Sequence, residues 1–218
     1  MAIAFDASSS GNSSGGSSYS YNHTCTGSNL YLFVATSTNA TAVTHDGVSL
    51  SLLRTYTPTF PPATNCVPIK VWGLQNPATG VKSITVTSGA DTSVACSYTG
   101  LSPAPNETYS ESDSAGNQVP TQTDTLTTIT PNAWHITFII GTNNFPNTFS
   151  AGSGTTHRVS RTSISAPAIG ILDSGGEVVT PSSHNNVCNW SSSSGFLTLV
   201  GFSIAPVFES KGSFLQYF

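Results

Sequence analysis

The sequence predicts an all-β protein built as an antiparallel β-sandwich or jelly roll. Short runs of alternating apolar and hydroxyl side chains recur about every ten residues, and turns rich in Gly, Pro and Asn separate them. No segment of about ten residues keeps apolar positions at helical spacing without an interrupting Gly, Pro or β-branched run. A chain of 218 residues can bury a substantial core, so we expect one sandwich domain, residues 1–206, followed by a tail, residues 207–218.

The first half contains the clearest strands. "AIAFDA" opens the chain, and a Ser/Gly-rich loop is expected from Ser8 to Ser18. "NLYLFVATST" carries apolar side chains at alternate and intervening positions, which is typical of a strand covered on both sides. "ATAVTHDGVSLSLLRTYT" predicts a hairpin, because Asp46-Gly47 supplies the positive φ angles of a tight turn.

A second hairpin is predicted for residues 69–87. "IKVWGL" and "VKSITVT" are the strands, and "NPATG" is the turn, in which Pro77 presets φ and Gly80 closes the loop. In the second strand Ile84 and Val86 share one face with Lys82, while hydroxyl side chains occupy the other. "TSVACSYTGL" follows as the next strand.

The later sequence alternates between polar and apolar segments. Residues 102–125 are polar and interrupted by prolines, which predicts a long exposed loop. "AWHITFIIG", "PAIGILD" and "GFLTLVGFSIAP" are predicted strands, and the last is apolar on both faces and therefore expected to be central.

The tail departs from this pattern because it is rich in large apolar groups. Chain ends are normally polar, so we expect these side chains to be covered. A final edge strand on the protein's own sandwich and an arm that docks on a partner chain are both compatible with the pattern. The candidate docking residues are Phe208, Phe214, Leu215, Tyr217 and Phe218.

Charged residues make up only 7 % of the chain, against about 25 % in ordinary soluble domains. The net charge is −4 and the basic residues are scattered, which argues against nucleic-acid binding. No apolar run reaches the length of a membrane span, and the start lacks the pattern of a secretory signal. A virion protein released by host lysis, or a chain whose leader has been removed, would reconcile this with an otherwise extracellular composition.

Four cysteines are far apart in sequence: Cys25, Cys66, Cys96 and Cys188. Their spacing does not resemble a zinc site. Two disulfides of undetermined pairing and buried free thiols are both compatible with the sequence.

The sequence offers little evidence of catalysis. Glu107, Glu111 and Asp113 are the nearest approach to a carboxylate pair, but Gly116 occupies the place of the second glutamate in the E-x-D-x-x-E pattern of laminarinase-type enzymes. The five histidines lack metal-ligand spacing, and no nucleophile elbow occurs. Trp72, Trp134 and Trp190 fit core positions better than sugar-stacking platforms. We therefore expect no cofactor, no metal site and no enzymatic activity.

An ordered series of fragments resembles a family of β-sandwich proteins from phage and environmental bacterial genomes. The fragments are "AIAFDASSSG", "GSNLYLFVATS", "ATAVTHDGVSLSLL", "VWGLQNPATGVKSITVT", "SVACSYTGL" and "SSSGFLTLVGFSIAP". Such domains occur in head-decoration proteins, head fibres and tail-fibre modules. The resemblance implies a concanavalin A-like jelly roll and transfers no functional residue.

The leading hypothesis is a capsid decoration or cement protein on the virion surface. Its expected partner is the major capsid protein or another virion protein, and it would act as a homo-oligomer, with a trimer favoured. A carbohydrate-binding module or adhesin, using Trp or Tyr side chains in residues 102–125 and 181–195, is the second hypothesis. An extracellular filament subunit is the third.

Overall fold

The structure, a computed structural model, consists of antiparallel β-sheets. It describes residues 1–13, 18–37, 39–58, 67–87, 92–114, 120–141, 148–162, 167–178, 181–191 and 196–207, apart from the side chains of residues 104–106. All regular elements in this part of the chain are strands. The sequence-based prediction of an all-β protein is confirmed.

Residues 4–99 form two of the four sheets. The strands are β1 (Ala4–Asn12), β2 (Ser18–Cys25), β3 (Tyr31–Ser37), β4 (Ala42–His45), β5 (Val48–Ser49), β6 (Ser51–Tyr56), β7 (Ile69–Gln75), β8 (Gly80–Thr87) and β9 (Thr92–Thr99). One sheet has the order β1-β9-β3-β7-β6, and the other has the order β2-β8-β4-β5.

Residues 101–206 form the other two sheets. The strands are β10 (Leu101–Asp113), β11 (Thr121–Thr127), β12 (Trp134–Gly141), β13 (Phe149–Ala151), β14 (Thr156–Arg161), β15 (Ala168–Asp173), β16 (Ser183–Trp190) and β17 (Leu197–Pro206). Their sheets have the orders β10-β17-β12-β15-β14 and β11-β16-β13. As predicted, β17 lies inside its sheet and is buried along its whole length.

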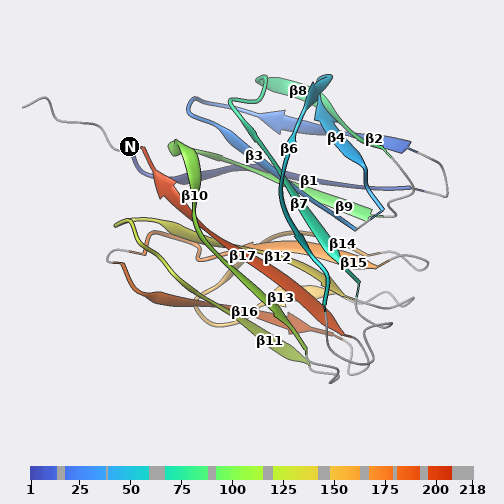
Figure 1. Cartoon of the computed structure of the whole chain (residues 1–218). Coiled ribbons are helices and arrows are strands. Elements are labelled where there is room, and N and C mark those ends of the chain that lie inside the picture. The colour runs from blue at the N-terminus through green and yellow to red at the C-terminus, as the bar shows by residue number, and fades with distance from the viewer. Residues whose placement is uncertain are drawn as a thin grey trace, which may run out of the picture.

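The four sheets are stacked in four layers, with the two five-stranded sheets in the middle (Figure 1). The largest core cluster joins the two five-stranded sheets and includes Phe33 and Tyr98 from one and Phe138 and Phe202 from the other. Separate clusters fill the space between each five-stranded sheet and its outer sheet. The chain therefore forms two sandwiches packed face to face, where the sequence led us to expect one sandwich.

The two halves repeat the same connections. Each strand of the second half takes the sheet position of its counterpart in the first, from β1 and β10 to β9 and β17. The registers also correspond, as one row of directly paired residues across four neighbouring strands shows in each half. Across β1, β9, β3 and β7 the row is Ser9–Ala95–Val34–Trp72. Across the corresponding strands β10, β17, β12 and β15 the row is Ser110–Gly201–Thr137–Leu172.

Local sequence explains the turns that were predicted correctly. Asp46 and Gly47 have φ angles of 52° and 80°, as the hairpin between β4 and β5 requires. Asn76 and Gly80, at the two ends of the predicted turn between β7 and β8, also have positive φ. On β8, Ile84 and Val86 face the core and Val81 faces solvent.

Two predicted loops are strands in the structure. β1 extends through Asn12 and β2 begins at Ser18, so most of the expected Ser/Gly-rich loop pairs in a sheet. The polar segment 102–125 contains most of β10 and the first part of β11. β10 is an edge strand with register shifts near its prolines, and an edge strand tolerates residues that cannot donate to a ladder.

Candidate functional site

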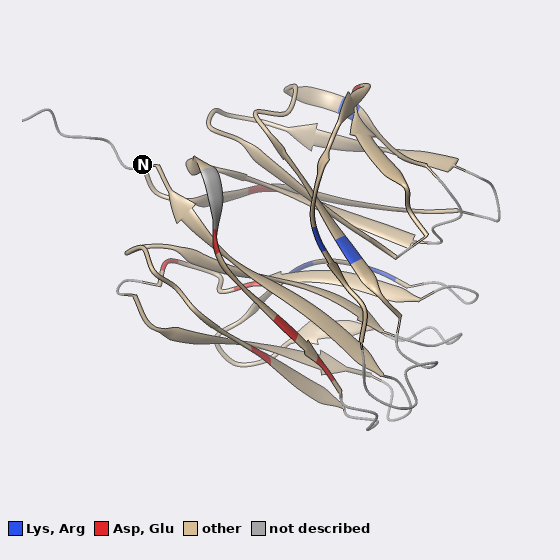
Figure 2. Cartoon of the chain, in the orientation of Figure 1, with Lys and Arg blue, Asp and Glu red and all other residues tan. Residues whose placement is uncertain are grey.

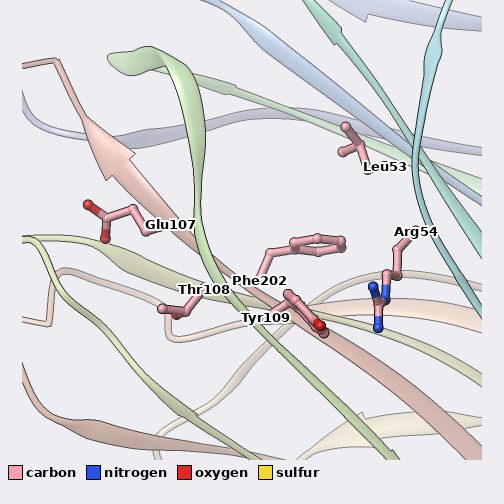
Figure 3. A pocket seen from close by; sticks show the side chains of 6 residues that line it. All are labelled: Leu53, Arg54, Glu107, Thr108, Tyr109 and Phe202. Carbon is pink, nitrogen blue, oxygen red and sulfur yellow. The ribbon is translucent and has the colours of Figure 1, made fainter.

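A pocket of about 190 Å³ opens at the junction between the two sandwiches. Its lining comes from β6 (Leu53, Arg54), β10 (Glu107, Thr108, Tyr109) and β17 (Phe202). Figure 3 shows Leu53 opposite the Phe202 ring, Arg54 beside Tyr109 at one end, and Glu107 at the other end. Tyr109 is 55 % exposed, so the pocket is reachable from solvent.

Two β-bulges place these side chains. The register of β6 shifts between Leu52 and Arg54, and that of β10 shifts between Asn106 and Tyr109. A bulge leaves a residue outside the ladder and bends the strand, which changes the direction of its side chain. Leu53 is the extra residue of β6, and Glu107 and Thr108 together lie opposite the single residue Ser203 of β17, so the pocket is formed by irregularities in both edge strands.

The acidic residues of β10 are tied to neighbouring strands. Arg54 Nε donates to Glu111 Oε1 at 2.5 Å, and the Tyr56 hydroxyl donates to Asp113 Oδ2 at 2.8 Å. Glu107 Oε2 accepts from the Thr130 backbone N–H at 3.1 Å. Figure 2 shows a basic segment of β6 and several acidic segments of β10, and the ion pair between Arg54 and Glu111 joins these two strands. The Glu111 hydrogen bond raises the pKa of Arg54 and keeps it charged.

At the corresponding junction on the other side of the molecule, Arg158 connects the two sandwiches. This residue is the extra residue of a bulge in β14, between His157 and Val159, and by register it takes the place that Leu53 has in β6. Its guanidinium lies 4.4 Å from the centre of the Phe5 ring, and its Nε donates to Asp173 Oδ2 at 2.6 Å. Burial, the largest single effect, lowers the pKa of Arg158, but the hydrogen bond to Asp173 and the charge interactions with Asp173, Tyr98 and Cys96 together outweigh burial and raise the pKa.

A buried polar cluster lies between β10, β11, β12 and β17. The Asp124 carboxylate accepts from Ser110 Oγ at 2.5 Å and Thr137 Oγ1 at 2.6 Å, and lies 2.9 Å from His135 Nε2. Burial raises the pKa of Asp124, but the hydrogen bonds from His135, Ser110 and Thr137 outweigh it and lower the pKa. Gly201 makes room for the cluster, because a Cβ there would lie 2.2 Å from Asp124 Oδ2.

This cluster has the residue types of a catalytic triad but not the arrangement. A nucleophilic serine must bond to the histidine that takes its proton. Ser110 instead donates to Asp124, and both Asp124 and His135 are fully buried. We interpret the cluster as a satisfied polar core of the second sandwich.

The first sandwich has a related cluster around His23. His23 Nδ1 lies 2.7 Å from Ser9 Oγ, and His23 Nε2 lies 3.0 Å from Ser97 Oγ. Ser97 donates its own hydrogen to Asp6, so its oxygen accepts from Nε2–H, and Nδ1 accepts from Ser9. Burial, together with the nearby His45, lowers the pKa of His23 to about 4, although Asp6 acts in the opposite direction.

The residues singled out from the sequence are widely dispersed. Cys25, Cys96 and Cys188 are buried free thiols, and Cys66 lies outside the described residues. The three tryptophans are each 7 % exposed or less and belong to the core clusters. The candidate docking residues Phe208, Phe214, Leu215, Tyr217 and Phe218 also lie outside the described residues.

Sequence reasoning did not identify the pocket. Among its lining residues, Glu107 drew attention as one member of a carboxylate set, and Tyr109 as the tyrosine within residues 102–125, where the carbohydrate-binding hypothesis placed its contacts. Leu53 and Phe202 are ordinary strand residues, and no local pattern indicates that they meet. Paired prolines and a run of polar residues next to Tyr109 were the available signal for an irregular edge strand.

The described part of the chain has no group of three or more His, Cys, Asp or Glu side chains placed to hold a metal ion. In the same residues there is no helix long and apolar enough to cross a membrane. Comparisons with protein-family models, with curated proteins and with solved structures found no match to this chain.

Proposed function

We propose that this chain is a structural protein of the virion surface, a decoration protein that binds the capsid lattice as a homo-oligomer, with a trimer favoured. The observation that carries the proposal is the fusion of two sandwiches through one continuous core, with all four edges of the inner sheets modified by bulges. Such a unit is rigid and discrete, which suits a subunit that must persist outside a cell.

The bulged edges distinguish this function from a filament built by strand addition. β1, β6, β10 and β14 are the edge strands of the five-stranded sheets, and the register shifts in each of them. Bulges at sheet edges hinder pairing with strands of other molecules. The bulges make the inner-sheet edges poor sites for strand addition, which favours docking through a face or a terminal segment.

The outer faces of the stack also suit exposure to variable surroundings. Ser20 bonds to Thr85 at 2.8 Å across β2 and β8, and Thr121 and Thr125 bond to asparagines of β16 at 3.0 and 2.9 Å. Hydroxyl and amide contacts of this kind are less sensitive to salt than ion pairs are. We therefore expect the fold and its contacts to change little with ionic strength.

The connection order of each half supports the jelly-roll interpretation. Most successive strands lie in different sheets; the exceptions are the directly paired strands β4–β5, β6–β7 and β14–β15. As a result, β1 pairs with β9 and β2 with β8 in the first half, and β10 with β17 and β11 with β16 in the second. Double-sheet jelly rolls are common in viral capsid proteins and lectins. The fold is therefore compatible with the proposed role and with sugar binding.

Co-sedimentation with empty capsids, assembled from the major capsid protein of the same genome, tests the proposal. The full chain should sediment with the capsids at a saturating, fixed ratio. A chain ending at Val207 keeps the backbone bond from Val207 to Gly100 and removes the apolar segment, and we expect it to bind at least tenfold more weakly.

Val81→Ala is the control, because Val81 is exposed on an outer sheet far in sequence from the tail, and it should bind like the full chain. Undiminished binding of the shortened chain would remove the tail from the docking mechanism. Failure of the full chain to bind any capsid of its own genome would refute the proposed function.

A further inference from the structure

The pocket between β6 and β10 combines aromatic surface with hydrogen-bonding groups of both kinds. Phe202 is only 4 % exposed and forms the floor, while the ring of Tyr109 is accessible. Arg54 carries N–H donors, and Glu107 carries carboxylate acceptors. Tyr109 adds a hydroxyl group, which can donate and accept, whereas the Thr108 hydroxyl donates to the Thr127 carbonyl oxygen at 2.8 Å and can only accept from a ligand.

These groups favour a neutral polyhydroxylated ligand over ions and purely apolar molecules. An anion would meet the carboxylates of Glu107 and Glu111, and a cation would meet Arg54. An apolar ligand would cover the other carboxylate oxygen of Glu107 and the Arg54 guanidinium without hydrogen-bonding to them, which is costly. A sugar ring offers an apolar C–H face for aromatic side chains and hydroxyls for the polar ones.

The volume of the pocket limits the ligand to one sugar ring. About 190 Å³ corresponds to roughly six water molecules at about 30 Å³ each. Drug-sized ligands occupy pockets of about 300 Å³ or more. A single pyranose unit, at the end of a glycan or as a side branch, matches this space.

The polar groups are held in place before any ligand arrives. Glu107 Oε2 accepts from the Thr130 N–H at 3.1 Å and from Ser203 Oγ at 3.3 Å. Arg54 is fixed by Glu111, and its guanidinium lies 4.0 Å from the centre of the Tyr109 ring. Preorganised side chains lower the entropy lost on binding.

The pocket is not a necessary consequence of the fold. At the corresponding junction the bulge residue is Arg158, whose long side chain reaches Phe5 and Asp173. Leu53 has a shorter, uncharged side chain at the matching position of β6. The same position of the architecture therefore carries a long charged side chain at one junction and a short apolar one beside the pocket at the other.

We propose that the open pocket binds one saccharide unit of a glycan, with Tyr109 and Phe202 contacting the ring face and Arg54 and Glu107 contacting its hydroxyls. This activity goes beyond capsid docking and does not depend on it. A sugar site at the junction would give the protein a second binding surface, separate from the C-terminal segment.

Saturation-transfer NMR on the full chain, followed by titration, tests the proposal. The probes are the methyl glycosides of glucose, galactose, mannose, N-acetylglucosamine and rhamnose. At least one should bind with a dissociation constant of about a millimolar or tighter, as expected for a ligand of this size. Tyr109→Ala should weaken binding of that glycoside at least tenfold, and Glu107→Gln about fivefold.

Two controls separate loss of the site from loss of the fold. Val81→Ala removes an equally exposed side chain from an outer sheet and should bind like the parent protein. Unfolding midpoints of the Tyr109 and Glu107 variants should stay close to that of the parent. The proposed site is refuted if no glycoside saturates the protein at about twenty times the expected millimolar dissociation constant. It is also refuted if Tyr109→Ala binds the glycoside as tightly as the parent protein does.

Discussion

His23 should make the protein lose stability as the pH falls from neutral to 4. Burial lowers its pKa from 6.5 to about 4, so the folded state resists protonation that the unfolded chain accepts. The folded and unfolded states bind different numbers of protons at His23 only between these two pKa values. The contribution of His23 to the free energy of unfolding is therefore fully present above pH 6.5 and is lost as the pH falls towards 4. Two and a half pKa units at about 1.4 kcal/mol each give a loss of about 3 kcal/mol.

The structure explains why protonation is unfavourable at this position. His23 is 1 % exposed, and its Nδ1 must accept a hydrogen bond from Ser9 while its Nε2–H donates to Ser97. The His45 ring lies 6.5 Å away, so a second positive charge would be close by. A protonated His23 would lose its acceptor role and remain buried.

Urea unfolding at pH 7.5 and 4.5 measures the effect in the parent protein and in His23→Gln. The fall in free energy of unfolding between these pH values should be about 2 kcal/mol smaller in the variant, whatever its stability at pH 7.5. Ser20→Ala, on the outer face of β2, should retain the parental pH dependence. An NMR titration that gives His23 a pKa near 6.5 in the folded protein would refute the reasoning.

Three further predictions concern packing, charge pairs and thiols. Gly201→Ala should destabilise the protein by about 2 kcal/mol or more, because the new Cβ would clash with Asp124. Gly176 has open space around it, so Gly176→Ala should change stability by less than about 0.5 kcal/mol. Urea unfolding measures both variants, and equal effects would contradict the geometry of the Asp124 cluster. Arg158→Met leaves the buried Asp173 carboxylate without its cation and should lower the free energy of unfolding by about 3 kcal/mol. Arg54→Met removes the more exposed ion pair with Glu111 and should lower it by about 1 kcal/mol or less. The reverse order in urea unfolding would contradict the difference in burial between the two ion pairs. In a Cys66→Ser protein, the three remaining thiols should react with a thiol reagent only after denaturation, because they are buried and burial raises their pKa values. Rapid labelling of the folded protein would contradict the buried positions of these cysteines.

The strand predictions succeeded where local sequence carries the information. β3 and β17 are apolar on both faces because each is covered by core clusters on both sides. The hairpin at Asp46-Gly47 follows from backbone preferences alone. These features depend on neighbours in sequence or on simple periodicity, so they could be predicted.

The errors arose where tertiary pairing overrides local preference. Segment 102–113 contains two prolines and many polar residues, yet it forms β10, because β17 provides a partner on one side and the other edge needs none. The β1–β2 region is rich in Ser and Gly, but β9 and β8 pair with it. Composition could not reveal partners that are far apart in the chain.

The matching topology of the two halves was also missed, because corresponding side chains differ. Asn29 and Asn132 both have positive φ just before a central strand, and Ser9–His23 and Ser110–Asp124 are both fourteen residues apart and hydrogen-bonded. Leu32 and Val34 are apolar where His135 and Thr137 are polar, so the two halves differ in the chemistry of their inner faces. Spacing, rather than residue identity, was the surviving signal.

Calorimetric unfolding is the most direct test of the shared core between the two sandwiches. Both the proposed role as a rigid capsid subunit and the junction pocket depend on this core. One transition is expected, with equal calorimetric and van't Hoff enthalpies of about 150 kcal/mol near 60 °C for a chain of this length. Two transitions, or a van't Hoff enthalpy of about half the calorimetric value, would show that the halves unfold independently and would contradict a single core.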